Sequence, residues 1–294
     1  MGKRSGVAIT LWVVIAALVV LSAAFLAGRA RFVRFFEAAR EKEAAARVEH
    51  AIKSTLALTR LRVTEKLSFP SSDKLLSTRD ARELGTGLYE RSIELEIPPA
   101  GPAGSATRGI RLHYSSASED ASFESYLDGT RIFFRAGTIG GHAGEAKWVK
   151  IDAGDLPRVS GALDEAARAE ISWMTSVRGV DSLLPRGIGG GARVVALRRE
   201  SVDGVRYIVA DLRTPDLDAE FAKGSGKGGA QPEPMRYEVR VWVPEAGEAY
   251  IARLEEAYVY RMKEQETYDY VISSKLLEPD ERLAIKLPED GLLH

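Results

Sequence analysis

The sequence predicts an α+β domain in which helices pack on an antiparallel sheet of about ten strands, preceded by one transmembrane helix. Three observations predict this class. Residues 7–27 form an apolar run without a charged residue. Segments that alternate polar and apolar residues fill most of the chain beyond residue 90, and two carry an Asp-Gly turn. Among them, residues 159–177 have instead the 3.6-residue period of a helix.

The composition excludes several classes of function. The 41 basic and 42 acidic residues leave a net charge of −1, which argues against a nucleic-acid partner. Because the chain has no cysteine, it can form no disulfide, zinc-thiolate site, thiol nucleophile or thioether lipid. A hydrophobic content of 45% is ordinary for a globular protein with a real core.

The apolar run is long enough to cross a bilayer. At about 1.5 Å per residue, a helix over residues 7–28 spans the ~30 Å hydrocarbon core, and residues 1–6 form a short cytoplasmic N-terminus. The alternative is a signal peptide cleaved near Ser22-Ala23-Ala24, but the apolar part of such a peptide is typically about 7–15 residues. We therefore expect a retained signal-anchor.

The charges that flank this run do not decide its orientation. Lys3 and Arg4 precede it, and Arg29, Arg31 and Arg34 follow it, so the positive-inside count does not favour a domain outside the cell. We nonetheless expect a single-pass protein of the cell membrane with its domain outside the cytoplasm. The six residues before the run are too few to form a domain, and the family resemblance described below points the same way.

Residues 29–60 are predicted to form a helical stem and first helix. Apolar residues recur at helical spacing, as in Ala45, Val48, Ile52 and Leu56, and no Pro or Gly interrupts residues 30–69. The segment either lifts the domain off the membrane or packs on it as an amphipathic helix. The domain itself is expected over residues 61–290.

Alternating segments follow as predicted strands. Asp128-Gly129 and Asp203-Gly204 are the strongest hairpin signals, because a type I′ turn needs positive φ at both central residues. The helical segment has one apolar stripe, Leu163, Ala167, Ile171 and Met174, and should end near Gly179. The predicted strands cover residues 91–97, 110–116, 123–137, 147–152, 192–212, 235–243, 250–262 and 267–276.

The candidate chemical motifs fail on inspection. "GSGKGG" resembles a phosphate-binding loop, but Phe221 and Gly228 stand where the motif needs Gly and Ser or Thr. The four histidines have no metal-ligand spacing, and no G-x-S-x-G elbow occurs. We expect no catalytic residue, metal or cofactor.

The order of the remaining motifs resembles the LppX/LprG family of actinobacterial envelope lipoproteins, within the LolA/LolB-like superfamily. The resemblance runs over about residues 45–290, through "YLDGTRIFFRAG", "KWVKID", "DSLLPRG", "VDGVRYIVADL", "RYEVRVWVPEAGEAYIARLE" and "ERLAIKLPED". It implies a curved antiparallel half-barrel with helices on its concave face, and an apolar cavity between them that takes acyl chains. It also implies lipid or lipoglycan transport in the cell envelope.

The chain departs from this family at one position. Leu26-Ala27-Gly28 reads like the residues before a lipobox cysteine, but Arg29 follows. A chain without that cysteine cannot be lipidated there, and a spanning helix holds a protein more firmly than one acyl chain does. The departure favours a fixed handover protein over a carrier that travels.

Alternating strand positions and the helical stripe supply the candidate lipid-cavity residues. The competing interpretation of each is ordinary core packing, and the sequence does not say which sheet face turns inward. The candidates are Tyr237, Val239, Val241, Tyr268, Tyr270, Ile272, Leu163, Ile171 and Met174.

Two functions of different class follow. The first is a membrane-tethered extracytoplasmic protein that binds or transfers lipid, with the bilayer and a lipid or lipoglycan as partners. The second is an envelope interaction or sensor module of LolA-like fold that binds another envelope protein and carries no lipid. A structural stalk-and-head protein is a third, weaker interpretation, and an enzyme is the least favoured.

The membrane anchor is directly testable. Intact protein from the membrane fraction should begin at Met1 and should resist carbonate extraction, because residues 7–28 stay in the bilayer. N-terminal sequencing of the membrane-bound protein checks this. A mature N-terminus at Phe25 or Arg31 would instead establish cleavage.

Overall fold

A computed structural model describes residues 37–84, 89–97, 110–117, 121–139, 142–143, 148–155, 165–214, 233–262 and 266–288. The chain divides into two compact units, Met1–Ala46 and Arg47–His294. In the first unit the described residues, 37–46, are helical, and the helix runs on to residue 56. The predicted span over residues 7–28 lies outside the described residues. No helix within the described ranges is long and apolar enough to cross a membrane.

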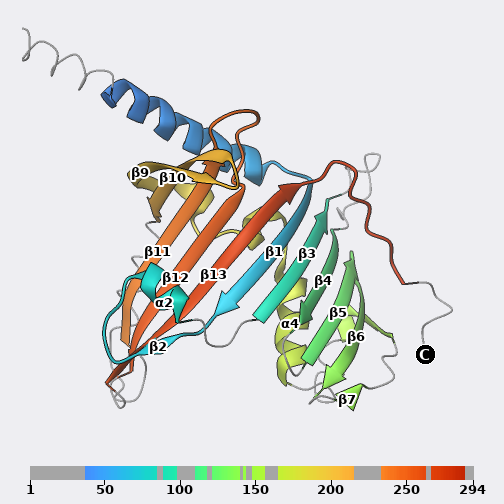
Figure 1. The fold of residues 1–294 in the computed structure, drawn as a ribbon. Helices are drawn as coiled ribbons and strands as arrows, with labels where there is room; N and C mark the ends of the chain where they lie inside the picture. The colour runs from blue at the N-terminus through green and yellow to red at the C-terminus, as the bar shows by residue number, and fades with distance from the viewer. Residues whose placement is uncertain are drawn as a thin grey trace, which may run out of the picture. The chain divides into compact units, whose positions relative to one another are not determined.

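The second unit is built on one antiparallel sheet, in which the described residues form thirteen strands (Figure 1). The main path runs β7-β6-β5-β4-β3-β1-β13-β12-β11-β10-β9, with β2 beside β13 and β8 beside β6. The strands are β1 (Arg60–Ser68), β2 (Ser71–Ser72), β3 (Tyr89–Glu96), β4 (Arg111–Ala117), β5 (Ala121–Asp128), β6 (Arg131–Ile139), β7 (His142–Ala143), β8 (Val149–Asp152), β9 (Arg193–Val202), β10 (Val205–Arg213), β11 (Glu233–Pro244), β12 (Arg253–Met262) and β13 (Thr267–Pro279).

One long-range pairing joins two series of sequential strands. Strands β1 and β3–β6 form one meander and β9–β13 the other, and β1 pairs with β13 from Leu61↔Pro279 to Ser68↔Ile272. Within the described residues the sheet is open, because β7 and β9 each have a neighbour on one side only. The antiparallel architecture is as predicted, although the estimate of ten strands was low.

Side chains alternate between the two faces of the sheet, and the pairing registers carry this alternation from strand to strand. We call one side the α4 face, because Ser125 on it donates a hydrogen bond to Met174 Sδ of helix α4 (Glu165–Ser176) at 2.6 Å. We call the other the α2 face, because Tyr270 and Ile272 on it pack with Ala81 of helix α2 (Thr78–Glu83).

The α4 face carries most of the hydrophobic core. Ile171 and Met174 of α4 have no exposed surface, as the predicted stripe requires, while Leu163 lies outside the described residues. Farther along the chain, the 3₁₀ helices η3 (Val180–Leu183) and η4 (Ile188–Gly190) bury Leu183 and Ile188. Lys275 of β13 reaches the Leu183 carbonyl at 3.0 Å, which places η3 on the same face. Covering the sheet in this way stabilises the unit by removing apolar surface from water.

The helix end at residues 47–56 is bound to the turn after β11. Arg47 Nε donates to the Pro244 carbonyl at 2.8 Å, and its Nη2 donates to the Gly247 carbonyl, also at 2.8 Å. Thr55 Oγ1 donates to the Ala51 carbonyl and accepts from the Ile251 amide, each at 2.8 Å. A buried backbone N–H therefore finds its partner in a helix far away in sequence.

Strand β1 was not predicted. Residues up to about 61 were expected to be helical, but the helix ends at residue 56 and β1 begins at Arg60. Leu61, Val63 and Leu67 alternate as a strand requires, while Glu65 occupies a fourth inward position and breaks the apolar pattern. Glu65 is buried because it is paired there, as described below.

The two Asp-Gly turns differ. Asp203 and Gly204 have φ of 51° and 80°, the positive values that a type I′ turn requires, and Val202 pairs with Val205 across them. Asp128, in contrast, stays in the ladder opposite Arg131, so the turn residues are Gly129 and Thr130. Of the two, Gly129 has a positive φ of 63°, which is the type II′ pattern with Gly first. The first hairpin turn was thus predicted one residue early.

Gly204→Ala tests the second turn. A side chain at φ +80° is strained although the space around it is open, so the substitution should lower the free energy of unfolding by about 1–2 kcal/mol. Gly190→Ala is the matched control, because a Cβ there meets nothing and no left-handed φ is involved. Urea unfolding of both variants measures the difference. Equal midpoints for the two would contradict the turn assignment.

Candidate functional site

The six strand candidates for the lipid cavity divide between the two faces. Tyr237, Val239 and Val241 pair with Tyr258, Glu256 and Leu254, which puts them on the α4 face. Tyr268, Tyr270 and Ile272 lie on the α2 face. The two triplets therefore lie on opposite sides of the sheet.

The triplet on the α2 face belongs to a filled core. Tyr270 and Ile272 are each 1% exposed and pack with Ala81, Ala257 and Val259, while Tyr268 packs at the edge of this cluster. The Leu76 amide donates to the Tyr270 hydroxyl at 2.7 Å. Helix α2 thus covers these residues. Their position corresponds to ordinary core packing, which the sequence left open as the alternative to lining a cavity.

The triplet on the α4 face reaches a cavity between β10 and β11. The two strands are paired from Tyr207↔Pro244 to Leu212↔Val239, β10 ends at Arg213, and the β9–β10 register shifts at Asp211/Leu212. A cavity of about 420 Å³ lies at this end of the ladder, within the range of small-molecule sites. Of the predicted residues, Tyr237 and Val239 line it, while Val241 is fully buried and is not among the lining residues.

The lining of this cavity combines apolar and charged side chains. Leu212, Val239, Tyr237 and the exposed Val195 give it apolar surface. Asp211, Arg213, Glu238 and Arg240 supply the charges. Thr214 is 2% exposed, and its hydroxyl has no hydrogen-bond partner among the described residues. Such an orphan hydroxyl is costly unless a ligand or water atom satisfies it.

Tyr237 closes one wall and is fixed by its neighbours on β12. Its hydroxyl donates to Glu256 Oε1 at 3.1 Å, and its ring lies 4.5 Å from the ring of Tyr258. Burial raises the pKa of the Tyr237 hydroxyl far above its usual value, and the charge of Glu256 adds to the effect. Tyr237 is therefore a neutral hydrogen-bond donor with a rigid ring.

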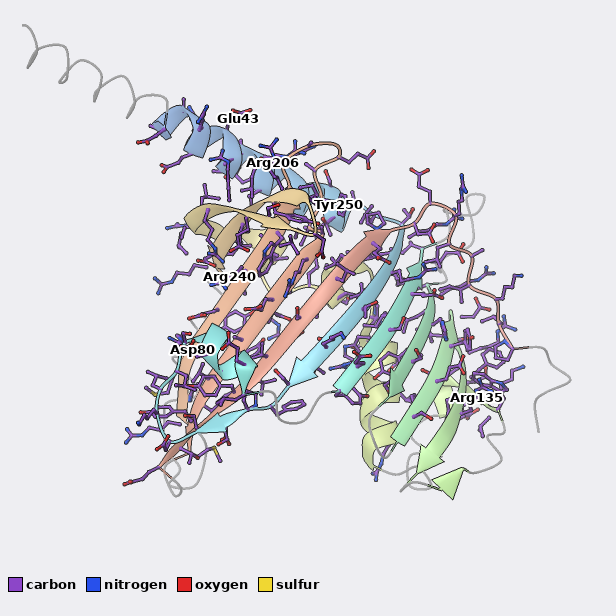
Figure 2. All side chains as sticks on the ribbon, viewed as in Figure 1. Glu43, Asp80, Arg135, Arg206, Arg240 and Tyr250 are labelled. Atoms are coloured by element: carbon purple, nitrogen blue, oxygen red, sulfur yellow. The ribbon has the colours of Figure 1, made fainter. Side chains whose placement is uncertain are left out.

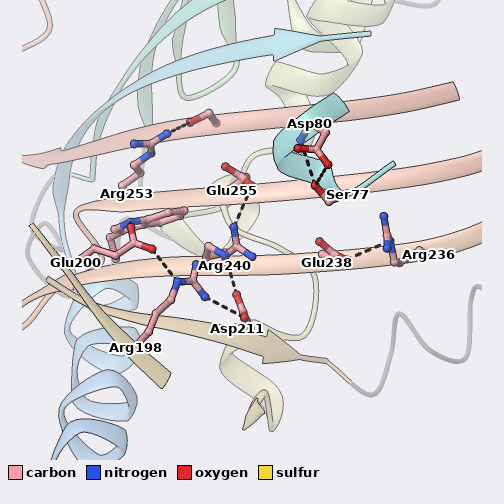
Figure 3. A network of polar contacts seen from close by, with 12 residues as sticks. Ser77, Asp80, Arg198, Glu200, Asp211, Arg236, Glu238, Arg240, Arg253 and Glu255 are labelled. Atoms are coloured by element: carbon pink, nitrogen blue, oxygen red, sulfur yellow. Dashed lines mark hydrogen bonds and ion pairs between the residues drawn. The ribbon is translucent and has the colours of Figure 1, made fainter. Parts of the chain in front are cut away.

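An ionic network holds the charged side of the cavity (Figure 3). Asp211 receives Arg240 Nε at 2.7 Å and Arg198 Nη1 at 3.1 Å. Arg198 also donates to Glu200 at 2.7 Å, and Glu200 accepts from Trp242 Nε1 at 3.1 Å. Asp211 and Arg240 are thus positioned by strands on both sides of the cavity.

A second ionic network interrupts the α4 face farther inward. Glu65 of β1 is 5% exposed. It accepts from Ser273 Oγ at 2.5 Å and pairs with Arg91 Nε at 3.1 Å and Lys275 Nζ at 3.9 Å. Lys275 also donates to Glu256, the partner of Tyr237, at 2.9 Å. The apolar surface of this face is therefore not continuous from β11 to β3.

Sequence reasoning missed the polar half of the cavity. Thr214 follows the predicted strand 192–212, and Asp211 and Arg240 occupy polar positions of alternating strands. Polar residues at such positions normally face solvent. Asp211 and Arg240 lie on the α2 face, and they share a cavity with Tyr237 of the α4 face because that cavity lies at the end of the β10–β11 ladder.

A second cavity, of about 570 Å³, lies on the α2 face of β1 and β3–β6. Its side-chain lining on this face is polar: Thr64, Ser92, Ser115 and Ser122 provide hydroxyls, and Glu90, Glu124 and Arg135 provide charges. Figure 2 labels Arg135 near this cavity and Arg240 at the first one, on different parts of the sheet.

Comparisons with known proteins add no functional argument. No family model matches the sequence, and no curated protein matches it. Among solved structures, the chain is similar to a DUF1329 family protein from Desulfovibrio piger, with 10% identity and a TM-score of 0.27 over 83% of this chain and 94% of that one. A likeness this weak supports no conclusion about the site.

The network at the cavity predicts a dependence of stability on pH. Burial alone would raise the pKa of Glu200, but hydrogen bonds from Arg198 and Trp242 outweigh it and hold the pKa below its ordinary value of 4.5. Glu200 therefore stabilises the fold above about pH 4.5, and this contribution is lost as the pH falls through the lower folded pKa. Glu200→Gln should cost about 0.5–1 kcal/mol at pH 7 and should flatten the loss of stability in acid.

Denaturant unfolding between pH 7 and pH 2 measures both effects. Glu248→Gln is the control, because Glu248 is exposed in the turn after β11. An acid profile of Glu200→Gln that coincides with the wild-type profile would rule out this role.

Proposed function

We propose that the protein is a membrane-tethered, extracytoplasmic lipid-binding or lipid-transfer protein, and that it holds its ligand in the β10–β11 cavity. The observation that carries this proposal is the composition of the cavity. Tyr237, Val239 and Leu212 form an apolar wall beside the charges of Asp211 and Arg240. The buried Thr214 hydroxyl, which has no hydrogen-bond partner among the described residues, lies with them.

Such a lining suits an amphiphile better than a purely polar or purely apolar ligand. An acyl chain against Leu212 and Val239 would remove apolar surface from water, at about 0.8 kcal/mol per buried CH₂. A head group with hydrogen-bond donors and acceptors would meet Asp211, Arg240 and the Thr214 hydroxyl. A hydrocarbon alone would leave that hydroxyl without a partner.

The finer architecture expected from the family resemblance belongs to this proposal. Helices on the α4 face of a large antiparallel sheet are compatible with a half-barrel whose concave side is covered. The signal-anchor over residues 7–28 would hold the domain at the outer surface of the membrane. The ion pairs of Glu65, Arg91 and Lys275 restrict an acyl chain to the β10–β12 part of the α4 face, because a chain extended toward β3 would have to cover paired charges.

One observation favours the alternative, an envelope protein-interaction module without lipid. Phe69, Leu75 and Leu84, in the segment that leads into and out of α2, are about half exposed at 49%, 50% and 48%. Exposed apolar side chains that gather into a patch mark protein-interaction sites. The same experiment separates the two functions.

Full-length protein, delipidated in detergent, should take up a fluorescent fatty-acyl probe. Native mass spectrometry of protein purified from its own cells should show a co-purifying lipid. Val239→Trp fills the cavity and should weaken probe binding at least tenfold, since the indole occupies the space of the acyl chain. Val205→Trp, at a position 46% exposed in the β9–β10 hairpin, is the matched control.

Thr214→Val separates binding from folding. It removes a buried hydroxyl that has no partner among the described residues, so the fold should be as stable as the wild type or more stable, while binding of the natural lipid weakens. Absence of both probe uptake and co-purifying lipid would refute the lipid function and leave the interaction module.

A further inference from the structure

A row of short hydroxyl side chains crosses the α2 face at the other part of the sheet. Thr64 of β1 pairs with Ser92 of β3, and Ser92 pairs with Ser115 of β4. The row continues into Glu124 of β5 and Arg135 of β6. Because cross-strand partners point to the same side, these five residues form one line across the sheet, and all five line the 570 Å³ cavity.

The cavity is a groove because the side chains in the neighbouring cross-strand rows are longer. On one side stand Arg62, Glu94, His113 and Tyr126, which are register partners across the same strands. On the other side stand Lys66 and Glu90. The hydroxyl row between these longer side chains leaves a trough whose floor is Thr64, Ser92 and Ser115. We call it the hydroxyl groove.

The floor of the hydroxyl groove has unused hydrogen-bonding capacity. The hydroxyls of Thr64, Ser92 and Ser115 are half-buried, and they make no hydrogen bond to another described residue. Each hydroxyl offers one donor and two acceptor positions. Glu124, in contrast, is already held by Arg135 at 2.7 Å, Tyr126 at 3.1 Å and His113 at 3.2 Å.

The charges along the groove are internally compensated. Arg135 pairs with Glu124, Lys66 with Glu90 at 2.5 Å, and Arg62 with Glu94 at 3.0 Å. An anionic or cationic ligand would therefore find no surplus of opposite charge. An apolar ligand would bury three hydroxyls without partners. The remaining class is a neutral ligand rich in hydroxyls, which can donate to and accept from the floor hydroxyls and can donate to the fixed carboxylate.

We propose that the hydroxyl groove binds a neutral saccharide, with Thr64, Ser92 and Ser115 contacting its hydroxyls and Glu124 and Arg135 closing one end. This site lies on the opposite face from the lipid-facing wall of the β10–β11 cavity. It does not depend on lipid binding, and either site can fail without the other. The sugar is free oligosaccharide or the head group of a neutral glycolipid, and the two sources share this chemistry.

Saturation-transfer NMR on full-length protein in a detergent without a sugar head group tests the proposal. The probes are maltotriose, mannotriose and tri-galacturonic acid. A neutral trisaccharide should show saturation transfer and the acidic one should not. Digalactosyl diacylglycerol in the same micelles should displace the free sugar if the natural source is a glycolipid, and should leave it bound if the source is free oligosaccharide.

Ser115→Val should weaken this binding at least tenfold, because it removes a floor hydroxyl and fills the trough with a residue that strands accommodate well. Ser201→Val, at an exposed position of β9, is the matched control and should bind as the wild type does. Ser92→Ala, which adds no bulk, repeats the test if Ser115→Val does not fold. The proposal is overturned if no neutral sugar binds, if only the acidic one binds, or if both groove variants bind normally.

Discussion

The pairing of β1 with β13 is the constraint on which the rest of the structure depends. Every other main pairing joins strands that are close in sequence, but this one aligns Leu61 with Pro279 and continues through Ser68 and Ile272. It joins two separate meanders into one sheet. It also fixes the face of the sheet to which each side chain of the two meanders points. Because such a contact closes a loop of most of the chain, it is entropically costly and slow to form.

Buried charges accompany this pairing. Glu65 faces Lys275 across β1 and β13, and it also meets Arg91 of β3 and Ser273 of β13. A buried ion pair is weak evidence for net stability, but a charge that loses its partner inside a protein is strongly unfavourable. A shift of one residue in the β1–β13 register would move Glu65 away from these partners and turn the apolar face of one meander to the side opposite that of the other. We infer that the network favours the correct register more than it adds stability.

The parts of the fold that depend on local chemistry could be predicted from sequence, and those that depend on distant partners could not. The turn at Asp203-Gly204 follows from two residues that tolerate positive φ. The turn near Asp128 shifted by one residue because Arg111 and Arg131 both bind the Asp128 carboxylate within the ladder. β1 was missed because Glu65 resembles a residue on the surface of a helix until Arg91 and Ser273 are placed beside it. Alternation assigned Tyr237 and Tyr270 to the apolar positions of their strands. That these positions lie on opposite faces of the sheet follows only from the register through β12.

The same register places polar side chains on both sides of the sheet. On the α4 face, the Glu65 network separates the apolar surface beside β10–β12 from the core beneath α4. On the α2 face, α2 covers Tyr270 and Ile272, whereas the rows from Arg62 to Tyr126 and from Thr64 to Arg135 lie on the other meander. Longer charged side chains of these rows therefore flank the short side chains of Thr64, Ser92 and Ser115. The two cavities therefore have different origins: one lies where the β10–β11 ladder ends, and the other lies where short side chains cross the paired strands β1, β3 and β4.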